Sequence, residues 1–223
     1  MKNSANNITV RAARVEDAPL IAEVIAMAIG DKEALRNYCG EEYMCVLTTI
    51  ASREATQYSW QNALVAEVDG VAAGAVVGYD GAELYSLRAG TFNILMESVG
   101  RVPTIIDETE AGEYYLDSVG VLPAFRNHGV GRALVSAFCK KVFNEGHARV
   151  GLIVEEENPN AERLYTSLGF ERVGTKLFFG HTMKHLQRHA TALQNYSIIE
   201  VSERTELDEE GRPFPLLYMS LQG

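Results

Sequence analysis

The fold is decided by residues 117–134, which read Asp117-Ser118-Val119-Gly120-Val121-Leu122-Pro123-Ala124-Phe125-Arg126-Asn127-His128-Gly129-Val130-Gly131-Arg132-Ala133-Leu134. The first part predicts a β-strand, because valine is a strand-favouring residue. Pro123 should end this strand, since proline has no N–H to donate to a neighbouring strand. From Gly129 onward the apolar residues fall on one face of a helix; they are Val130, Ala133, Leu134, Ala137, Phe138 and Val142.

The turn before this helix contains two glycines, Gly129 and Gly131, one residue apart. Without Cβ atoms, glycines let a ligand approach the backbone closely. The free N–H groups of a first helical turn attract anions, and the helix dipole adds to that attraction. Arg126 and Arg132 bring positive charge to the same turn. The pattern predicts an oxyanion or phosphate site; the alternative is a glycine-rich turn that binds nothing.

Two known nucleotide-binding motifs do not fit this turn. The Walker A motif G-x-x-x-x-G-K-[ST] is absent, and Leu134 stands where the Rossmann motif G-x-G-x-x-G needs its third glycine. The stretch resembles instead the acyl-CoA-binding motif of the GNAT superfamily of N-acetyltransferases, in the form V-x-V-x-P-x-x-R-x-x-G-x-G-x-x-L. Residues 158–170 resemble a second motif of that family, N-x-x-A-x-x-L-Y-x-x-x-G-F. The motifs and the segment joining them cover residues 114–174, and a looser likeness extends from residue 8 to about residue 189.

This resemblance implies an α/β fold with a mixed central sheet of about seven strands, flanked by helices, in which strands 4 and 5 splay apart. It also implies acetyl-CoA as co-substrate, with the pyrophosphate on the backbone amides of residues 127–133 and the pantetheine arm beside Val119 and Val121. The N–H of Val121 is expected to polarise the thioester carbonyl. The motifs assign cofactor contacts to Val119, Val121, Arg126, Asn127, His128, Gly129, Val130, Gly131, Arg132, Ala133, Asn158, Ala161 and Tyr165.

Tyr165 matches the tyrosine of the second motif. By this resemblance its hydroxyl protonates the thiolate of CoA as it leaves, which is a general-acid role. The alternative is a tyrosine that only packs on the apolar face of its helix.

An amine must lose a proton before it attacks an acyl group, and the family usually places a base or a water relay on the central strand. On this strand Glu113, Tyr115 and Asp117 alternate onto one face, which Val119 and Val121 share. Asp117 and Glu113 are therefore both candidate bases. Asp117 could equally be a structural hydrogen-bond acceptor.

The composition is that of a globular protein, with 223 residues, 47% hydrophobic residues and a net charge of −10. The negative charge argues against binding to nucleic acid or to a membrane surface, and no apolar run is long enough to span a bilayer. Three cysteines without a C-x-x-C pair suit a reducing compartment, which predicts a cytoplasmic protein. The histidines show no metal-ligand spacing, so no metal site is predicted.

The other elements follow from periodicity and turn signals along the chain. Strands are expected at 8–11, 63–68, 71–79, 114–122, 148–154, 170–173 and 178–186, and helices at 18–29, 43–51, 84–96, 129–145 and 158–168. One domain over residues 1–189 accounts for all of these. Residues 190–223 form an extension of unknown role, whose segments 196–201 and 216–219 could pair as a docked β-hairpin. The acidic run 107–113 is either a solvated loop or a rim that attracts an amine.

Three functions are compatible with these residues. The leading interpretation is an N-acetyltransferase that moves an acetyl group from acetyl-CoA to a small-molecule primary amine by direct attack. The second is a catalytically silent acyl-CoA-binding sensor, which would bind CoA without turnover. The third is a nucleotide-binding regulatory domain, which the missing Walker and Rossmann residues disfavour. The acceptor should be selected by residues 31–60 and 80–112, which carry no recognisable motif, and the family often forms homodimers.

Overall fold

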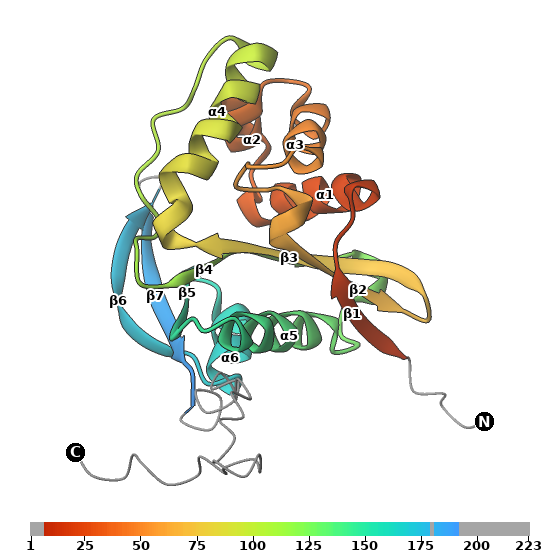
Figure 1. Ribbon diagram of the computed structural model, residues 1–223, viewed down its shortest axis with the longest axis vertical. Coiled ribbons are helices and arrows are strands. Elements are labelled where there is room, and N and C mark those ends of the chain that lie inside the picture. The colour runs from red at the N-terminus through yellow and green to blue at the C-terminus, as the bar shows by residue number, and fades with distance from the viewer. Residues whose placement is uncertain (1–6, 179–180, 192–223) are drawn as a thin grey trace, which may run out of the picture.

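The computed structural model describes residues 7–178 and 181–191 and contains a seven-stranded sheet with helices on both faces (Figure 1). The strand order is β1-β2-β3-β4-β5-β7-β6. All neighbouring pairs are antiparallel except β4 and β5, which are parallel. The mixed sheet expected from the sequence is thereby confirmed. The strands are β1 (Ile8–Ala12), β2 (Ala63–Val68), β3 (Val71–Asp80), β4 (Tyr114–Val121), β5 (Arg149–Glu155), β6 (Glu171–Phe178) and β7 (His181–His189).

The helices divide between the two faces of the sheet, as Figure 1 shows. One face is covered by α1 (Ala18–Ile29), α2 (Lys32–Cys39), α3 (Tyr43–Ser52) and α4 (Leu84–Val99), and the other by α5 (Val130–Asn144) and α6 (Pro159–Ser167). Each face has its own apolar core, one built around Leu134 and Phe138 of α5 and one around Ile21 and Ile25 of α1. None of the helices in the described part of the chain has the length and apolar character needed to span a bilayer.

Helix α2 was not expected from the sequence. It has only 8 residues, and its buried side chains are Leu35, Tyr38 and Cys39, too few to give a clear period. Its start carries an ordinary signal, because the Asp31 side chain accepts a hydrogen bond from Ala34 N at 2.8 Å. The helix therefore depends on packing against α3 and α4 more than on its own pattern.

The last two strands differ from the expected ranges, because the first is longer and the second begins and ends three residues later. The apolar pattern indicated 170–173 and 178–186, whereas β6 spans Glu171–Phe178 and β7 spans His181–His189. Strand β6 lies at the edge of the sheet, and five of its eight residues are exposed, among them Arg172 and Thr175. Exposed polar residues in an edge strand hide its extent from a hydrophobicity pattern. The strands expected at 196–201 and 216–219 lie outside the described residues.

Strands β4 and β5 are hydrogen-bonded only at one end. The register pairs Tyr114 with Val150 and Tyr115 with Gly151, and within the described sheet no later residue of β4 pairs with β5. On its other side, β4 stays paired with β3 as far as Val121. The two strands therefore part after Tyr115, which confirms the predicted splay of the fourth and fifth strands.

A bulge interrupts β4 at Asp117. The register pairs Val77 with Ser118 but Gly78 with Leu116, so Asp117 has no partner on β3. An extra residue of this kind bends a strand and redirects its own side chain. Asp117 thus differs from its neighbours in β4 both in its unpaired backbone and in its acidic side chain.

The bulge also changes which side chains share a face. Leu116, before it, and Val119 and Val121, after it, all contact the core on the α5 side. Tyr115 lies on the opposite face, in a cluster with Leu84 of α4. The expectation that the residues alternating from 113 to 117 share a face with Val119 and Val121 is wrong, because one inserted residue moves the rest of the strand to the other face.

Candidate active site

The gap between β4 and β5 is lined by backbone groups of β4 that have no partner on β5. Leu122 N donates to Ala73 O of β3 at 2.8 Å. Hydrogen bonds alternate along an antiparallel pair, so every second residue of β4 points its N–H and C=O toward β3. The residues between them, Val119 and Val121, point theirs into the gap, where β5 has moved away. An extended ligand with its own amides could pair with them there.

The turn before α5 offers a second set of free donors. Within residues 7–178 and 181–191, the backbone N–H groups of residues 127–132 have no hydrogen-bond acceptor. The N–H of Ala133, also expected to be free, donates instead to Gly129 O at 3.0 Å, within the first turn of the helix. Gly129 adopts φ 84° and Asn127 φ 65°, the left-handed region in which glycine is favoured and asparagine tolerated. This succession of free N–H groups at a helix N-terminus suits an anion.

Gly131 leaves open space at the same place. A Cβ built on it would lie 3.7 Å from Val121 Cγ2 and 3.8 Å from Leu164 Cδ2, which are ordinary contacts. Unlike at Gly129, the fold itself does not require glycine here. The missing side chain therefore leaves room between the end of β4 and α6.

We expect a Gly131→Val substitution to weaken acetyl-CoA binding at least about tenfold, or about 1.4 kcal/mol, while changing the melting temperature little. The added methyl groups fill the space beside the free N–H groups without striking the backbone. Titration calorimetry and thermal unfolding measure the two effects. Gly174→Val in β6, where a Cβ would meet nothing within 4 Å, is the matched control. Unchanged affinity in Gly131→Val would contradict a ligand site at this turn.

The two arginines of the turn join the walls of the gap. Arg126 Nε donates to Val121 O at 3.2 Å, which ties the turn to the end of β4. Arg132 Nη2 donates to Ser167 Oγ at 2.7 Å, which ties α5 to α6. Both guanidinium groups thus connect neighbouring elements by hydrogen bonds. They also bring the positive charge predicted for the turn.

The α6 residues of the second motif lie beside this turn. Asn158 Oδ1 accepts from Ala161 N at 3.1 Å and so caps α6. Ala161 packs against the core on the α5 side. The Asn158 side chain is therefore used within its own helix.

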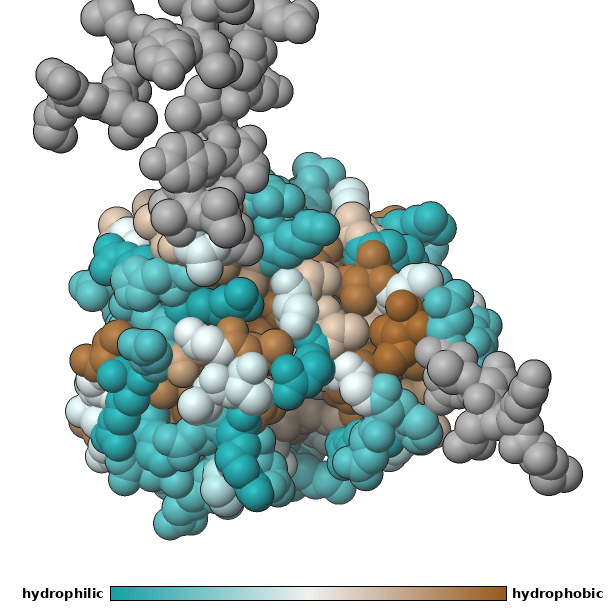
Figure 2. All heavy atoms as spheres, turned by 90° about the horizontal axis from the view of Figure 1, so that it is seen from below, coloured by the Kyte–Doolittle hydropathy of each residue, from teal (hydrophilic) through white to brown (hydrophobic). Residues whose placement is uncertain are grey.

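Seen from the α5–α6 side, hydrophobic side chains lie among hydrophilic ones near the middle of this face (Figure 2).

Tyr165 on α6 is 8% exposed and belongs to the same apolar cluster as Val119 and Val121. Its ring packs edge-on against Phe170, with 5.7 Å between centroids. Burial raises the pKa of Tyr165 to about 12, so the hydroxyl keeps its proton at neutral pH. In the described part of the chain no hydrogen bond occupies this hydroxyl.

Asp117 lies on the other face of the sheet. Its carboxylate accepts from Ser118 Oγ at 2.8 Å and from Tyr79 OH at 3.2 Å. Burial, and next the negative charge of Glu108, raise the pKa of Asp117 to about 7. A carboxyl group whose pKa lies near neutrality can both accept and release a proton at physiological pH.

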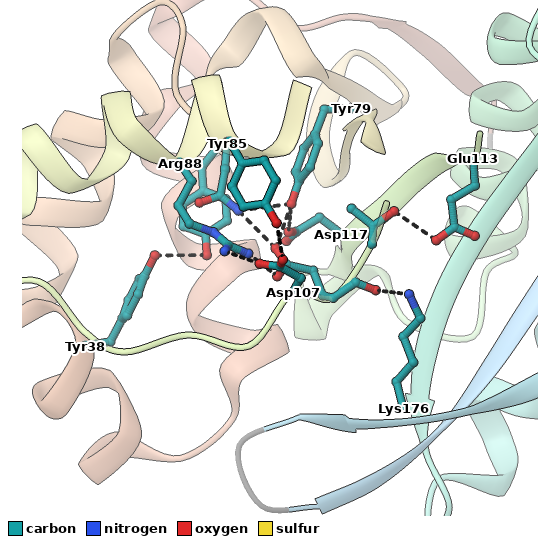
Figure 3. A network of polar contacts seen from close by, with 12 residues as sticks. Tyr38, Tyr79, Tyr85, Arg88, Asp107, Glu113, Asp117 and Lys176 are labelled. Carbon is teal, nitrogen blue, oxygen red and sulfur yellow. Dashed lines mark hydrogen bonds and ion pairs between the residues drawn. The ribbon is translucent and has the colours of Figure 1, made fainter. Parts of the chain in front are cut away.

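Asp117 belongs to a polar network that the sequence did not indicate (Figure 3). Tyr79 OH donates to Glu108 Oε1 at 2.9 Å, and Arg88 Nη2 lies 2.7 Å from Glu108 Oε2. Gln57 Nε2 donates to Glu108 Oε1 at 3.0 Å. Two buried atoms, Gln57 Oε1 and Arg88 Nε, have no partner within the described residues. The partners around Asp117 belong to no motif and come from separate segments, so no sequence spacing could have revealed their contacts.

Glu113 lies apart from this network, at the end where β4 and β5 are still paired (Figure 3). Its carboxylate accepts from Gln187 Nε2 at 2.7 Å and Thr109 Oγ1 at 2.8 Å, and lies 2.9 Å from His185 Nε2. A Cβ at Gly151 would lie 2.0 Å from Glu113 Oε2, so that glycine makes room for the carboxylate. Every oxygen of Glu113 is thus occupied by the protein itself, which suits a structural role.

We expect the stability of the protein to fall more steeply on acidification than that of a Glu113→Gln variant. Burial acts to raise the pKa of Glu113, but hydrogen bonds, above all from His185, outweigh it and hold the pKa below its usual range. The contribution of this carboxylate is therefore present above the usual glutamate pKa and is lost as the pH falls through the lowered one. Urea unfolding between about pH 6 and pH 3 measures this. Parallel pH dependences in the two proteins would contradict it.

No metal centre accompanies these groups in residues 7–178 and 181–191: no three His, Cys, Asp or Glu side chains are placed to hold an ion. Tyr165 and the free N–H groups of the turn thus lie beside the gap on the α5 side of the sheet. The Asp117 carboxylate lies on the opposite face of the sheet. Glu113 lies at the paired end of the strands.

Sequence comparison relates this chain to acetyltransferases. Residues 32–170 match the sequence profile of the acetyltransferase (GNAT) family. A mycothiol acetyltransferase of Gordonia bronchialis is 30% identical over 171 residues, which are 73% of this chain and 50% of that protein. The chain spans about half or less of the length of the curated relatives that it matches.

Solved structures share the fold. The crystal structure of an acetyltransferase superposes with a TM-score of 0.70 at 28% identity, covering 82% of this chain and 100% of that one. The PaiA N-acetyltransferase of Thermoplasma acidophilum, solved in complex with coenzyme A, superposes with a TM-score of 0.51 at 16% identity, covering 82% and 99%. The second similarity is one of fold alone.

Proposed function

The chain belongs to the acetyltransferase (GNAT) family, and from this premise we propose that it transfers an acetyl group from acetyl-CoA to a primary amine of a small molecule. The observation that carries the proposal is the parting of β4 and β5 after Tyr115. The gap opens beside the free N–H groups of residues 127–132, so donors for an amide-containing arm and for its pyrophosphate lie in succession.

Acetyl-CoA would lie along this path from the turn into the gap. The pyrophosphate would accept hydrogen bonds from residues 127–132, and the pantetheine arm would pair with Val119 and Val121. The unpaired backbone groups of β4 would then gain partners, which favours binding because such groups are costly to leave unmet once water is excluded. Bound in this way, the thioester would reach the level of the bulge in β4.

The acyl transfer would then use groups from both faces of the sheet. The amine nitrogen attacks the thioester carbon, and the N–H of Val119, the gap-facing residue of β4 nearest the bulge, stabilises the negative charge on the carbonyl oxygen. Val121, which the sequence suggested for this role, lies nearer the turn and would pair with the pantetheine arm instead. The proton lost by the amine goes to the Asp117 carboxylate. The C–S bond breaks, and the departing thiolate takes a proton from the Tyr165 hydroxyl. Asp117 is preferred to Glu113 as the base because its pKa is raised to about 7 and its carboxylate is less fully enclosed.

A small-molecule acceptor and a cytoplasmic location are part of this proposal. Relatives named mycothiol acetyltransferase support an acceptor of low molecular weight, and the net charge of −10 suits a cationic amine better than a nucleic acid.

The experiment is to measure free thiol released from acetyl-CoA in the presence of a panel of amines, after calorimetry has established acetyl-CoA binding. Amine-dependent thiol release is expected, at least for one small primary amine. Binding without turnover on any amine would instead favour the sensor. The absence of acetyl-CoA binding would contradict both.

A further inference from the structure

Four side chains from four separate segments meet on the face of the sheet that carries α4, and Figure 3 labels three of them, Tyr79, Arg88 and Asp117. Tyr79 comes from β3, Asp117 from the bulge in β4, Arg88 from α4, and Glu108 from the irregular segment between α4 and β4. The Tyr79 hydroxyl lies 2.9 Å from Glu108 Oε1 and 3.2 Å from Asp117 Oδ2. One hydroxyl oxygen therefore links two carboxylates.

The two carboxylates linked by Tyr79 differ in whether a positively charged side chain accompanies them. Glu108 is 4% exposed and forms an ion pair with Arg88, which is 7% exposed. Lys176 Nζ donates to the backbone oxygen of Glu108 at 3.0 Å, which fixes the segment against β6. Asp117 makes no ion pair of its own within the described residues. Its negative charge is opposed by that of Glu108 across a shared hydroxyl.

The shared hydroxyl can satisfy only one carboxylate at a time. A tyrosine hydroxyl has one proton to donate, and its oxygen here also accepts from Gln57 Nε2 at 3.0 Å. When Tyr79 donates to Glu108, the Asp117 carboxylate loses one of its two donors. Such a buried, fully connected arrangement makes the state of one carboxylate depend on the other.

We propose that Glu108 is a positioning residue for acetyl transfer: it acts through Tyr79 on the Asp117 carboxyl group, holding that group in place and opposing its ionisation. This inference rests on the proposed function, in which Asp117 takes the proton of the amine. It assigns to the segment between α4 and β4 a part in setting the working pH of the reaction, and to Arg88 the part of holding the Glu108 carboxylate by an ion pair.

Other ionisable groups also face Asp117, and the elements packed around it supply them. Ser118 is its direct neutral partner. The hydroxyls of Tyr38 and Tyr58, 3.3 Å apart, come from α2 and from the segment after α3, and burial raises the pKa of each, so both stay neutral. In the part of the chain that the structure describes, ionisable groups that interact with Asp117 include Tyr38, Tyr58, Tyr79, Arg88, Glu108 and Tyr115.

The proposal predicts shifts of opposite sign. Glu108→Gln removes a negative charge and leaves Arg88 less balanced, so Asp117 should ionise at a pH about one unit lower. Tyr79→Phe removes a hydrogen bond to the Asp117 carboxylate, so that group should ionise at a higher pH. A merely structural role for either residue would lower activity or stability without these opposite shifts.

The experiment follows the ionisation of Asp117 with and without turnover. The carbon-13 signal of its side-chain carboxyl, assigned by its loss in Asp117→Asn, is titrated in the full-length wild type, Glu108→Gln and Tyr79→Phe. The acidic limb of kcat/KM is measured in the same proteins. Glu110→Gln is the matched control, because Glu110 is an exposed glutamate of the same segment without a side-chain partner in the described residues.

We expect the titration midpoint and the acidic limb to move down in Glu108→Gln, to move up in Tyr79→Phe, and to stay in Glu110→Gln. Unmoved midpoints in both test variants would overturn the inference, and so would equal movement in the control. The carboxyl titration needs no substrate. Expected shifts in an inactive wild type would therefore sink the proposed function while leaving the coupling between the two carboxylates intact.

Discussion

Tyr165→Phe is expected to lower kcat about 10²- to 10⁴-fold while leaving acetyl-CoA affinity nearly unchanged. General-acid catalysis contributes a factor of this size, and phenylalanine has no proton to give to the departing thiolate. The phenyl ring keeps the edge-on contact with Phe170, so packing should survive. Steady-state kinetics with the amine that gives turnover, together with calorimetry, measure the two quantities.

The control for this variant is Tyr114→Phe. Tyr114 is also a tyrosine packed edge-on against a phenylalanine, Phe138, and burial also raises its pKa to about 12. It lies at the paired end of β4 and has no role in the proposed reaction. Equal activity in the two variants would remove Tyr165 from the mechanism.

Asp117→Asn is expected to lower kcat/KM about 10²- to 10⁴-fold near neutral pH and to abolish the acidic limb of the pH profile. The wild-type limb should fall near pH 7, because burial and the charge of Glu108 raise the pKa of Asp117 to about that value. The group is ionised above its pKa, so activity rises with pH through the limb. An amide at this position cannot take up the proton of the amine.

The matched variant is Glu113→Gln, which makes the same change at the other carboxylate predicted from the sequence. It should keep the limb near pH 7 and lose stability instead, since three protein groups occupy the Glu113 carboxylate. If the limb disappears in Glu113→Gln and persists in Asp117→Asn, the assignment of the base is wrong.

Local patterns were enough to predict the motif-bearing half of the site. Residues 117–134 carry strand, turn and helix signals within a few residues of one another, and the structure places β4 and α5 there. The splay between β4 and β5 followed from the family resemblance, and the register confirms it. The roles of individual residues, Tyr165 and the turn amides included, stay predictions.

Features that depend on distant contacts could not be predicted. The bulge at Asp117 arises from the pairing of β4 with β3, and nothing in the β4 sequence marks it. Helix α2 is too short for a period and depends on its neighbours. The ion pair of Arg88 with Glu108 joins residues that are 20 positions apart and lie outside both motifs. Local sequence signals carry no information about such pairings.

The central claim is that acetyl-CoA lies in the gap between β4 and β5, with its pyrophosphate on the turn before α5. Amide hydrogen exchange tests it residue by residue, because exchange slows where an N–H gains an acceptor. We predict that acetyl-CoA slows exchange at Val119, Val121 and residues 127–132, all of which have free N–H groups without ligand. Slowed exchange elsewhere, with these amides unchanged, would contradict the account.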